Sequence, residues 1–239
     1  MNYKISVIIP AHNEEKYIKK CIDSLLRNNR EYIYEIIIVD NASDDKTSDI
    51  IKSYDNIRYV REDKKWLVNA RQVWYKVSKG DILAYIDADS RVPQDWVDKV
   101  INHFRNDNDL AFLSWPYIYY DTNIIQKVWI RIYWIFGWYL SYLIIWYLGV
   151  WWNMIIRKNI LDKIWWFDIN IEFYWEDTNI ARRINKVWKC IFDLRLINYT
   201  SARRLKQQWL INTWFIYVKN FLSQVLLKRS LDIDYKDRR

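Results

Sequence analysis

Two aspartates separated by a single residue follow a short hydrophobic segment in the first half of the chain. Asp87 and Asp89 come directly after residues 82–86, which we expect to form a buried β-strand. Residues i and i+2 of an extended chain point to the same side, so the two carboxylates should converge. Oxygen ligands arranged in this way can hold a hard divalent cation. The alternative is that Asp89 and Ser90 only cap the following helix.

A second acidic pair opens a predicted helix in the last third of the chain. Glu176 and Asp177 precede hydrophobic residues at helical spacing, namely Ile180, Ile184 and Val187. A carboxylate can accept a proton from a hydroxyl group that is about to react. Acids in a first helical turn also complement the positive end of the helix dipole. The residues alone therefore leave a catalytic and a structural role open.

The elements that must position these acids alternate along the first 115 residues. Hydrophobic segments predict strands, and the amphipathic segments between them predict helices. The expected strands are 4–9, 35–39, 57–60, 82–86 and 110–114, and one of the expected helices is 67–77. This alternation predicts an α/β fold with a Rossmann-like, mostly parallel sheet and helices on both faces. In open sheets of this kind, ligands bind at the carboxyl ends of the strands, where Asp87 and Asp89 are expected.

Residues 132–156 carry no formal charge and are numerous enough to cross a bilayer as one helix. Gly149 and Asn153 interrupt the segment, and its Tyr and Trp residues are spread along it rather than gathered at two ends. We therefore expect a helix at a membrane interface or in the core, followed by a short strand over 153–156. Residues 203–239 are predicted to form a basic amphipathic helix and tail, for which core packing and membrane docking both stay open.

The composition narrows the class of partner. The net charge of +8 favours an anionic partner, such as nucleotide phosphates, nucleic acid or an acidic membrane surface. The basic residues are scattered and form no recognisable nucleic-acid module, so we expect no nucleic acid. Cys21 and Cys190 form neither a disulfide framework nor a metal-binding spacing, which favours a reducing compartment. The chain begins with a strand, so no signal peptide is expected.

Four segments in order resemble the family 2 glycosyltransferases, which have the GT-A fold. They are SVIIPAHNEE, EIIIVDNASDD, DILAYIDADS and WWFDINIEFYWEDTNIARRI, and the similarity runs from Ile5 to about Thr200. The resemblance implies a glycosyltransferase domain over residues 1–202, with a C-terminal helical segment on the acceptor side. That domain would consist of a nucleotide-binding half, 1–115, and an acceptor half, 116–202, and would be followed by the helix and tail, 203–239.

The resemblance also implies roles for individual residues on the donor side. Asp40 would accept a hydrogen bond from the nucleotide base, and Arg71 would approach the nucleotide from the following helix. Asp87 would face the ribose and the metal, which is Mn²⁺ or Mg²⁺, and Asp89 would be the principal metal ligand. The other residues implied to line the nucleotide-sugar pocket are Pro10, Ala11, Asn13, Glu14 and Ala88.

On the acceptor side, Asp177 matches the family's general base, and Glu176 lies beside it. The implied reaction is inverting, metal-dependent transfer from a UDP- or GDP-sugar to an envelope polysaccharide or a lipid-linked acceptor. It would take place in the cytoplasm near the inner face of the membrane, with peripheral membrane contact. One alternative is a polyprenyl-phosphate sugar synthase, and another is a catalytically dead, membrane-associated binding protein with the same fold. A nucleotidyltransferase would need a phosphate loop rich in Gly and Arg after the first strand, and PAHNEE is not one.

Tryptophan and glycine occur in unusual numbers, with sixteen Trp and three Gly. An ordinary chain contains roughly 7% Gly. Eight tryptophans occupy positions where the resembled family has Gly, and these are 66, 74, 151, 152, 165, 166, 175 and 188. UGA encodes Gly in some bacterial lineages and Trp in others, so we expect that UGA codons were translated with the wrong code. The alternative is an enzyme that is genuinely rich in Trp.

Overall fold

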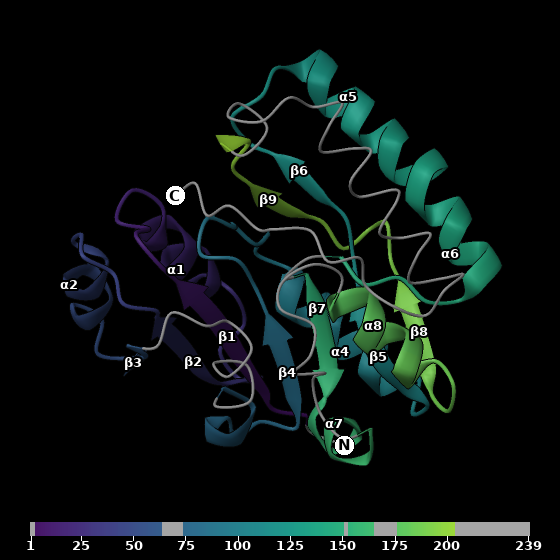
Figure 1. The fold of residues 1–239 in the computed structure, drawn as a ribbon, viewed down its shortest axis with the longest axis horizontal. Helices are drawn as coiled ribbons and strands as arrows, with labels where there is room; N and C mark the ends of the chain where they lie inside the picture. Colours follow the sequence, from purple (N-terminus) through teal and green to yellow (C-terminus); the bar gives the residue numbers. More distant parts are fainter. Residues whose placement is uncertain (1–2, 64–73, 151–152, 165–175, 204–239) are drawn as a thin grey trace.

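In the computed structural model, residues 3–63, 74–150, 153–164 and 176–203 are described. Seven strands of this part of the chain form one mixed sheet, in the order β3-β2-β1-β4-β7-β5-β8 (Figure 1). Four parallel strands make up its N-terminal half: β1 (Ile5–Ala11), β2 (Ile33–Asp40), β3 (Arg58–Arg61) and β4 (Ile82–Tyr85). The hydrophobic runs of β1, β2 and β4 are buried on both faces of the sheet, which explains why they do not alternate with polar residues.

The other half of the sheet contains an inserted antiparallel strand. β7 (Met154–Arg157) lies between β4 and β5 (Leu110–Ser114), antiparallel to both, while β5 runs parallel to β8 (Lys189–Phe192). The predicted strand over 153–156 is therefore present, and the sheet is mostly parallel as expected. Because β7 separates β4 from β5, strands from both sides of residue 115 belong to one continuous sheet.

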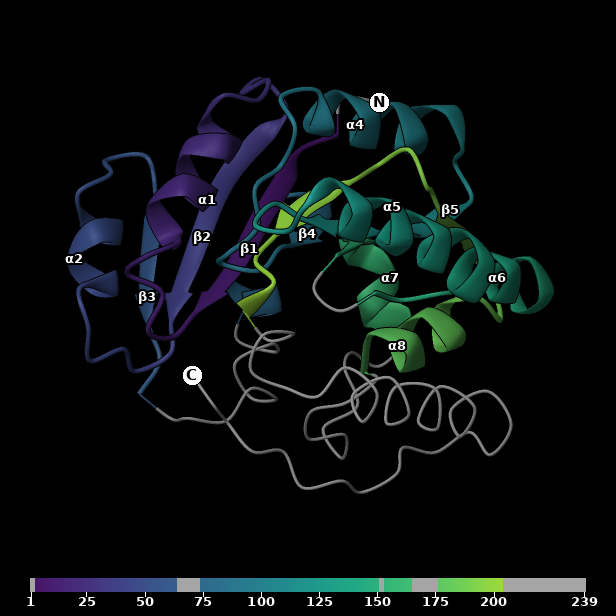
Figure 2. The same cartoon turned by 90° about the horizontal axis from the view of Figure 1, so that it is seen from above.

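Helices cover both faces, as predicted (Figure 2). α1 (Ile18–Leu26) and α4 (Trp96–Asn106) share a hydrophobic cluster with one face, and α2 (Thr47–Lys52) contributes Ile51 to it. α7 (Lys158–Lys163) and α8 (Glu176–Ile184) pack on the other face through residues that include Ile160 and Ile184. Val187 was expected in the stripe of α8. That prediction is wrong, because α8 ends at Ile184 and Val187 is exposed.

A small second sheet and a long helix complete the described chain. β6 (Tyr117–Tyr119) pairs in parallel with β9 (Asn198–Thr200). After β6, α5 (Ile124–Ile132), the π-helical η1 (Tyr133–Tyr139) and α6 (Leu140–Ile145) follow one another without a break, alongside β6 and β9 in Figure 1. The helix thus begins eight residues before the predicted segment and ends at Ile145. Large hydrophobic side chains along the helix are exposed, so its outer side is not packed in the core.

Two of the eight tryptophans proposed to replace Gly lie within the described residues. Trp74 is fully buried in the cluster beneath α8, and residues 74–77 are helical, in agreement with the predicted helix over 67–77. Trp188 is half-buried, and the Lys163 ammonium lies 5.3 Å from the centre of its ring. Both side chains take part in packing here. Positions 66, 151, 152, 165, 166 and 175 lie outside the described residues.

Candidate active site

The sheet topology brings the predicted acids to one edge. The carboxyl ends of β1, β2, β4 and β5 meet there, together with the amino end of the antiparallel β7 (Figure 1). Asp87 and Asp89 lie two and four residues after the end of β4, while Tyr85 at the end of β4 pairs with Met154 at the start of β7. The segment that leads into β7 and the two aspartates therefore lie at the same edge. In open α/β sheets, this edge binds ligands.

Asp89 faces charged and polar groups from the far end of the described chain. The Thr200 hydroxyl donates to its Oδ1 over 2.9 Å, and Arg203 Nε lies 3.4 Å from its Oδ2. The residue is only 8% exposed. The N-cap of α4 is Asp95, which makes no side-chain capping bond, so Asp89 and Ser90 do not cap that helix. The capping alternative raised by the sequence is therefore wrong.

Arg203 also binds Glu14, which lies in the loop after β1. Its Nη1 donates to Glu14 Oε2 over 2.7 Å, and its Nη2 donates to Oε1, so the pair is bidentate. Burial alone would lower the pKa of Arg203. The carboxylates of Glu14, Asp89 and Asp87 more than offset this effect and raise the pKa above its ordinary value. A permanently positive group thus joins the first loop to the aspartates after β4.

Arg203 has no role in the sequence-based expectations beyond the start of the basic C-terminal segment. The one local signal is its place three residues after Thr200, where the similarity to the family ends. Arginine forms planar, bidentate pairs with carboxylates more readily than lysine does. Its partners Glu14 and Asp89 are 189 and 114 positions away along the chain, a separation across which sequence patterns reveal no pairing.

Asp87 and Asp89 fit the protein's share of a divalent cation site. The described residues contain no group of three or more His, Cys, Asp or Glu arranged to hold a metal. Two carboxylates are nevertheless the usual protein contribution where phosphates of a nucleotide complete the coordination of Mg²⁺. The Arg203 guanidinium beside Asp89 indicates that the local field attracts a positive charge. The side chains present are thus compatible with Mn²⁺ or Mg²⁺.

The loop after β1 is tied to the loop after β2. Ala11 pairs with Asp40 across the two strands, and the Asn41 amide donates to the Ala11 carbonyl over 2.7 Å. Asn13 adopts a left-handed backbone conformation, with φ of 54°. Its amide donates to Ser43 Oγ over 3.0 Å, and its side-chain oxygen accepts from the Asp44 amide over 3.0 Å. Pro10, Ala11, Asn13 and Glu14 are therefore held in one structure at the carboxyl edge.

Asp40 is fully buried at the end of β2 and binds three donors. Its Oδ1 accepts from the Ser43 amide over 3.0 Å, while its Oδ2 accepts from the Tyr59 hydroxyl over 2.9 Å and from Arg61 Nη1 over 2.7 Å. Burial would raise the pKa of Asp40, but these hydrogen bonds hold it below its ordinary value. A carboxylate offers about four lone-pair positions. Tyr59 and Arg61 are partners that the sequence patterns did not indicate.

Asp177 is the second residue of α8 and packs against the segment that leads into β7. A Cβ added to Gly149 would collide with the backbone of Asp177, so only Gly permits this approach. Asp177 Oδ1 accepts from the Thr178 amide over 2.7 Å, and the Thr178 hydroxyl donates to the Gly149 carbonyl over 3.4 Å. These contacts hold the start of α8 at the amino end of β7. Glu176 is the first residue of α8, and Arg71 lies outside the described residues.

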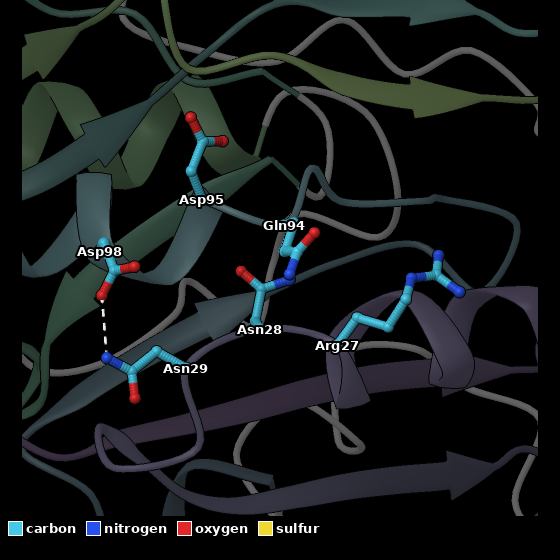
Figure 3. A pocket seen from close by; sticks show the side chains of 6 residues that line it. All are labelled: Arg27, Asn28, Asn29, Gln94, Asp95 and Asp98. Carbon is cyan, nitrogen blue, oxygen red and sulfur yellow. Dashed lines mark hydrogen bonds between the residues drawn. The ribbon is translucent and has the colours of Figure 1, made fainter.

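An open surface depression lies between the end of α1 and the start of α4 (Figure 3). Its lining residues are Arg27, Asn28, Asn29, Gln94, Asp95 and Asp98. Asn28 donates to the carbonyls of Ser24 and Pro93, and Asn29 donates to Asp98 Oδ1 over 3.1 Å. None of the predicted site residues lines this depression. Its polar groups join α1 to α4, which is a structural role.

A family model described as "Glycosyl transferase family 2" matches residues 6–165 of this chain. Glycosyltransferase AglE of Haloferax volcanii is 34% identical over 104 residues, which are 41% of this chain and 34% of that protein. A Methanococcus voltae enzyme named dolichyl N-acetyl-alpha-D-glucosaminyl phosphate 3-beta-D-2,3-diacetamido-2,3-dideoxy-beta-D-glucuronosyltransferase is 36% identical over 114 residues, 44% of this chain and 35% of that protein. The chain thus spans about a third of the length of these relatives.

Among solved structures, the chain is similar to the mannosyltransferase PcManGT from Pyrobaculum calidifontis, determined in complex with GDP-Man and Mn²⁺. The TM-score is 0.71 at 16% identity, and the match covers 95% of this chain and 64% of that chain. At this identity the likeness concerns the fold. The fold that brings Asp87 and Asp89 to the carboxyl edge of the sheet therefore also occurs in that enzyme.

Proposed function

This chain belongs to glycosyl transferase family 2 and has the GT-A fold, and from this premise we propose that it is an inverting, metal-dependent glycosyltransferase. Its donor is a nucleotide sugar, either a UDP- or a GDP-sugar. The observation that carries the proposal is the position of Asp87 and Asp89 in the loop after β4, with Asp89 facing a partly buried positive charge. An edge that holds Arg203 in this way can also hold a cation bound to a diphosphate.

The donor-binding residues come from two connected loops. Asp40 stays ionised through its bonds to Ser43, Tyr59 and Arg61. Its carboxylate is fully buried, so in this proposal it accepts from a nucleotide base only after one of these partners moves aside. Asn13 is locked against the same loop by two hydrogen bonds, so Pro10, Ala11 and Asn13 form a rigid wall. This prior ordering reduces the entropy lost when the nucleotide binds. Asp87 and Ala88 border the same edge beside the ribose, and Arg71 approaches the nucleotide in this proposal.

Asp177 is the general base of the proposed reaction, with Glu176 beside it. As the acceptor oxygen forms its bond to the anomeric carbon, Asp177 takes the hydroxyl proton, and the bond from that carbon to the diphosphate oxygen breaks. Attack from the side opposite the leaving group inverts the anomeric configuration. When bound by Asp89 and Asp87, Mn²⁺ or Mg²⁺ would neutralise the charge of the departing diphosphate. No acid is then needed on the leaving oxygen, in contrast to glycoside hydrolysis.

The proposed acceptor is an envelope polysaccharide or a lipid-linked glycan, used in the cytoplasm at the inner face of the membrane. The name of the M. voltae relative contains a dolichyl N-acetyl-alpha-D-glucosaminyl phosphate, which supports the lipid-linked choice. The long helix with exposed hydrophobic side chains supports peripheral membrane contact. A polyprenyl-phosphate sugar synthase is the second candidate, because the same helix would suit a lipid phosphate. Comparing products formed with lipid phosphate and with oligosaccharide acceptors separates the two.

A screen of sugar nucleotides tests the proposal. Titration calorimetry with UDP- and GDP-sugars, with and without Mn²⁺, should detect one donor whose binding needs the metal. Asp89→Ala should abolish that metal-dependent binding, because one oxygen ligand is lost and the diphosphate charge stays uncompensated. Asp95→Ala removes an exposed aspartate nearby and should bind as wild type does. Unchanged metal-dependent binding by Asp89→Ala would reject the metal assignment. Donor binding with neither turnover nor slow donor hydrolysis would favour the catalytically dead binding protein.

A further inference from the structure

The continuous helix from Ile124 to Ile145 presents a broad hydrophobic surface to solvent. By length and composition alone, these 22 residues would suffice to cross a membrane, yet only 11% of their most hydrophobic stretch is buried. We call this surface the apolar helix face. Its exposed side chains are Ile124, Ile125, Val128, Trp129, Ile132, Ile135, Phe136, Leu140, Leu143 and Ile144, and Trp146 follows directly. Contiguous exposed hydrophobic surface of this kind marks a protein or membrane interaction site.

The charges on this helix favour an anionic lipid surface over a second protein. Between Ile124 and Ile145 the charged residues are Lys127 and Arg131, both positive, and the sequence there contains no Asp or Glu. The whole chain carries a net charge of +8. A second copy would therefore bring like charge toward like charge, whereas the anionic headgroups of a bilayer would be attracted. Trp129 is exposed at this surface, and Trp is enriched at the interface between lipid and water.

The inner side of the helix is bound to the rest of the domain along its length. Trp134 Nε1 donates to the Tyr117 carbonyl over 2.8 Å, and the two rings lie edge to face with centres 5.0 Å apart. The Tyr142 hydroxyl donates to the Cys190 carbonyl over 3.3 Å. Trp138 is buried in the same cluster as Phe192. Because its inner side is attached to the rest of the domain, the helix is placed to lie along an interface with its exposed side toward lipid.

The same helix is joined by short contacts to the candidate active site. Tyr117, which supports Trp134, belongs to β6, and β6 pairs in parallel with β9. β9 ends at Thr200, whose hydroxyl binds Asp89. Figure 1 shows α5 and α6 running beside β6 and β9. A membrane in contact with the apolar helix face would therefore lie next to the part of the fold that covers Asp89.

From these observations, we propose that the apolar helix face docks on an anionic bilayer, with its large side chains at the boundary between headgroups and acyl chains. The proposal rests on the exposed hydrophobic side chains of the helix, on its positive charges and on the attachment of its inner side to the domain. None of these depends on the proposed reaction. The consequence for the acceptor rests on the proposed function: a lipid-linked acceptor would reach Asp177 from the surface on which the enzyme lies. The protein is then a peripheral enzyme that works along the membrane plane.

Co-sedimentation of the full chain with vesicles tests the docking. The vesicles contain phosphatidylglycerol with phosphatidylcholine, or phosphatidylcholine alone. Wild type should bind the anionic vesicles, and Trp129→Ser/Phe136→Ser/Ile144→Ser should lower the partition coefficient at least tenfold, because each change removes apolar area from the interface. Tyr34→Ser/Val187→Ser replaces exposed hydrophobic residues elsewhere and should bind as wild type does. Equal binding by the triple variant, or none by wild type, overturns the proposal.

Two further measurements distinguish membrane docking from self-association and from misfolding of the triple variant. Light scattering without lipid should give a monomer for wild type and for the triple variant. A wild-type dimer that the triple variant dissociates would instead identify the apolar helix face as an interface between copies, which overturns the proposal. Nucleotide-sugar titration of the triple variant should match wild type, which keeps failure of docking distinct from failure of the proposed catalytic function.

A single substitution keeps the docking testable if the triple variant misfolds. Loss of both vesicle binding and donor binding would indicate misfolding, and Phe136→Ser then replaces the triple variant in the same two measurements. Phe136 is 66% exposed, so its replacement should leave the fold intact. Phe136→Ser should weaken vesicle binding while donor affinity stays at the wild-type value. Unchanged vesicle binding by this folded variant would overturn the proposal.

Discussion

Arg203 Nε lies 3.4 Å from Asp89 Oδ2, so a residue near the end of the described chain neutralises the principal metal ligand predicted from the sequence. The other oxygen of Asp89 accepts from Thr200, and the rest of the guanidinium binds Glu14. Both carboxylate oxygens of Asp89 therefore have partners within the protein. A divalent cation that binds Asp89 must compete with the positive charge of Arg203.

Arg203→Met should consequently raise the affinity for Mn²⁺ in the absence of nucleotide, roughly tenfold or more. Two unit charges 4 Å apart interact by about 1–4 kcal/mol between bulk water and an effective dielectric constant of 20, and removing the positive one leaves the carboxylates to the metal. Calorimetry or electron paramagnetic resonance of free Mn²⁺ measures this. Arg203→Lys, which keeps the charge, and Arg195→Met, at an exposed arginine, should stay close to wild type. A weaker Mn²⁺ affinity in Arg203→Met would contradict the competition.

Asp177→Asn should lower turnover by roughly 10²-fold or more, because the side chain keeps its shape but no longer accepts a proton. Donor affinity should change little, since the amide keeps the shape of the side chain and the contacts of residue 177 with Gly149 and Thr178. Initial rates and donor titration on the same preparation provide the two readouts. Asp109→Asn alters an exposed aspartate and serves as the control. An equal loss of donor binding would make Asp177 a structural residue.

Trp146→Gly should stabilise the protein by about 1 kcal/mol. Trp146 follows α6 in a left-handed conformation, with φ of 63°, and is 66% exposed. A residue with a Cβ loses roughly 1–2 kcal/mol in this conformation, and helices commonly place Gly there. Urea denaturation measures the change in the free energy of unfolding. Trp146→Ala removes the ring but keeps the Cβ, so it should gain less, and equal gains would refute the backbone explanation.

The gene should contain UGA at tryptophan positions 66, 74, 151, 152, 165, 166, 175 and 188, and GGN codons at Gly80, Gly137 and Gly149. Position 146, identified by its backbone conformation, should also be UGA. Reading the gene is the measurement. Converting the eight tryptophans to Gly should raise the melting temperature, because overpacking costs about 1–3 kcal/mol per site. UGG at these positions would make the tryptophans native, and the packed Trp74 and Trp188 would then belong to the enzyme's own core.

Asp193 should make stability depend on pH in the acidic range. Burial would raise its pKa, but hydrogen bonds from His103 and Arg195 hold the pKa below its ordinary value of about 3.9. In the unfolded chain Asp193 binds its proton at higher pH than in the fold, so its contribution is present above about pH 4 and is lost below it. The difference in the free energy of unfolding between wild type and Asp193→Asn should shrink as the pH falls below about 4. A difference that grows on acidification would refute the assignment.

The strands and the position of the aspartates after β4 could be predicted from the sequence. Residues 35–39 and 110–114 are hydrophobic runs too short for helices, and a sheet covered on both faces is the arrangement that buries them fully. Asp87 and Asp89 follow such a run, and the carboxyl end of a strand is the ligand edge of an open α/β sheet. The extended geometry expected through Asp89 is wrong, because β4 ends at Tyr85 and the Ser90 amide donates to the Asp87 carbonyl across a turn at 88–89. The sequence by itself therefore determined the fold class and the family, together with the place along the chain of the candidate metal ligands.

Contacts between distant segments were decided only by the tertiary structure. Arg203 reaches Glu14 and Asp89 because β9 returns the chain beside the sheet edge, and Gly149 supports Asp177 because β7 is inserted between β4 and β5. Hydrophobicity likewise marked the segment 132–156 without showing where its helix begins and ends or which side meets solvent. Local sequence encodes the conformation of each segment, but these pairings follow from how segments far apart pack together, and one sequence pattern is compatible with several such packings.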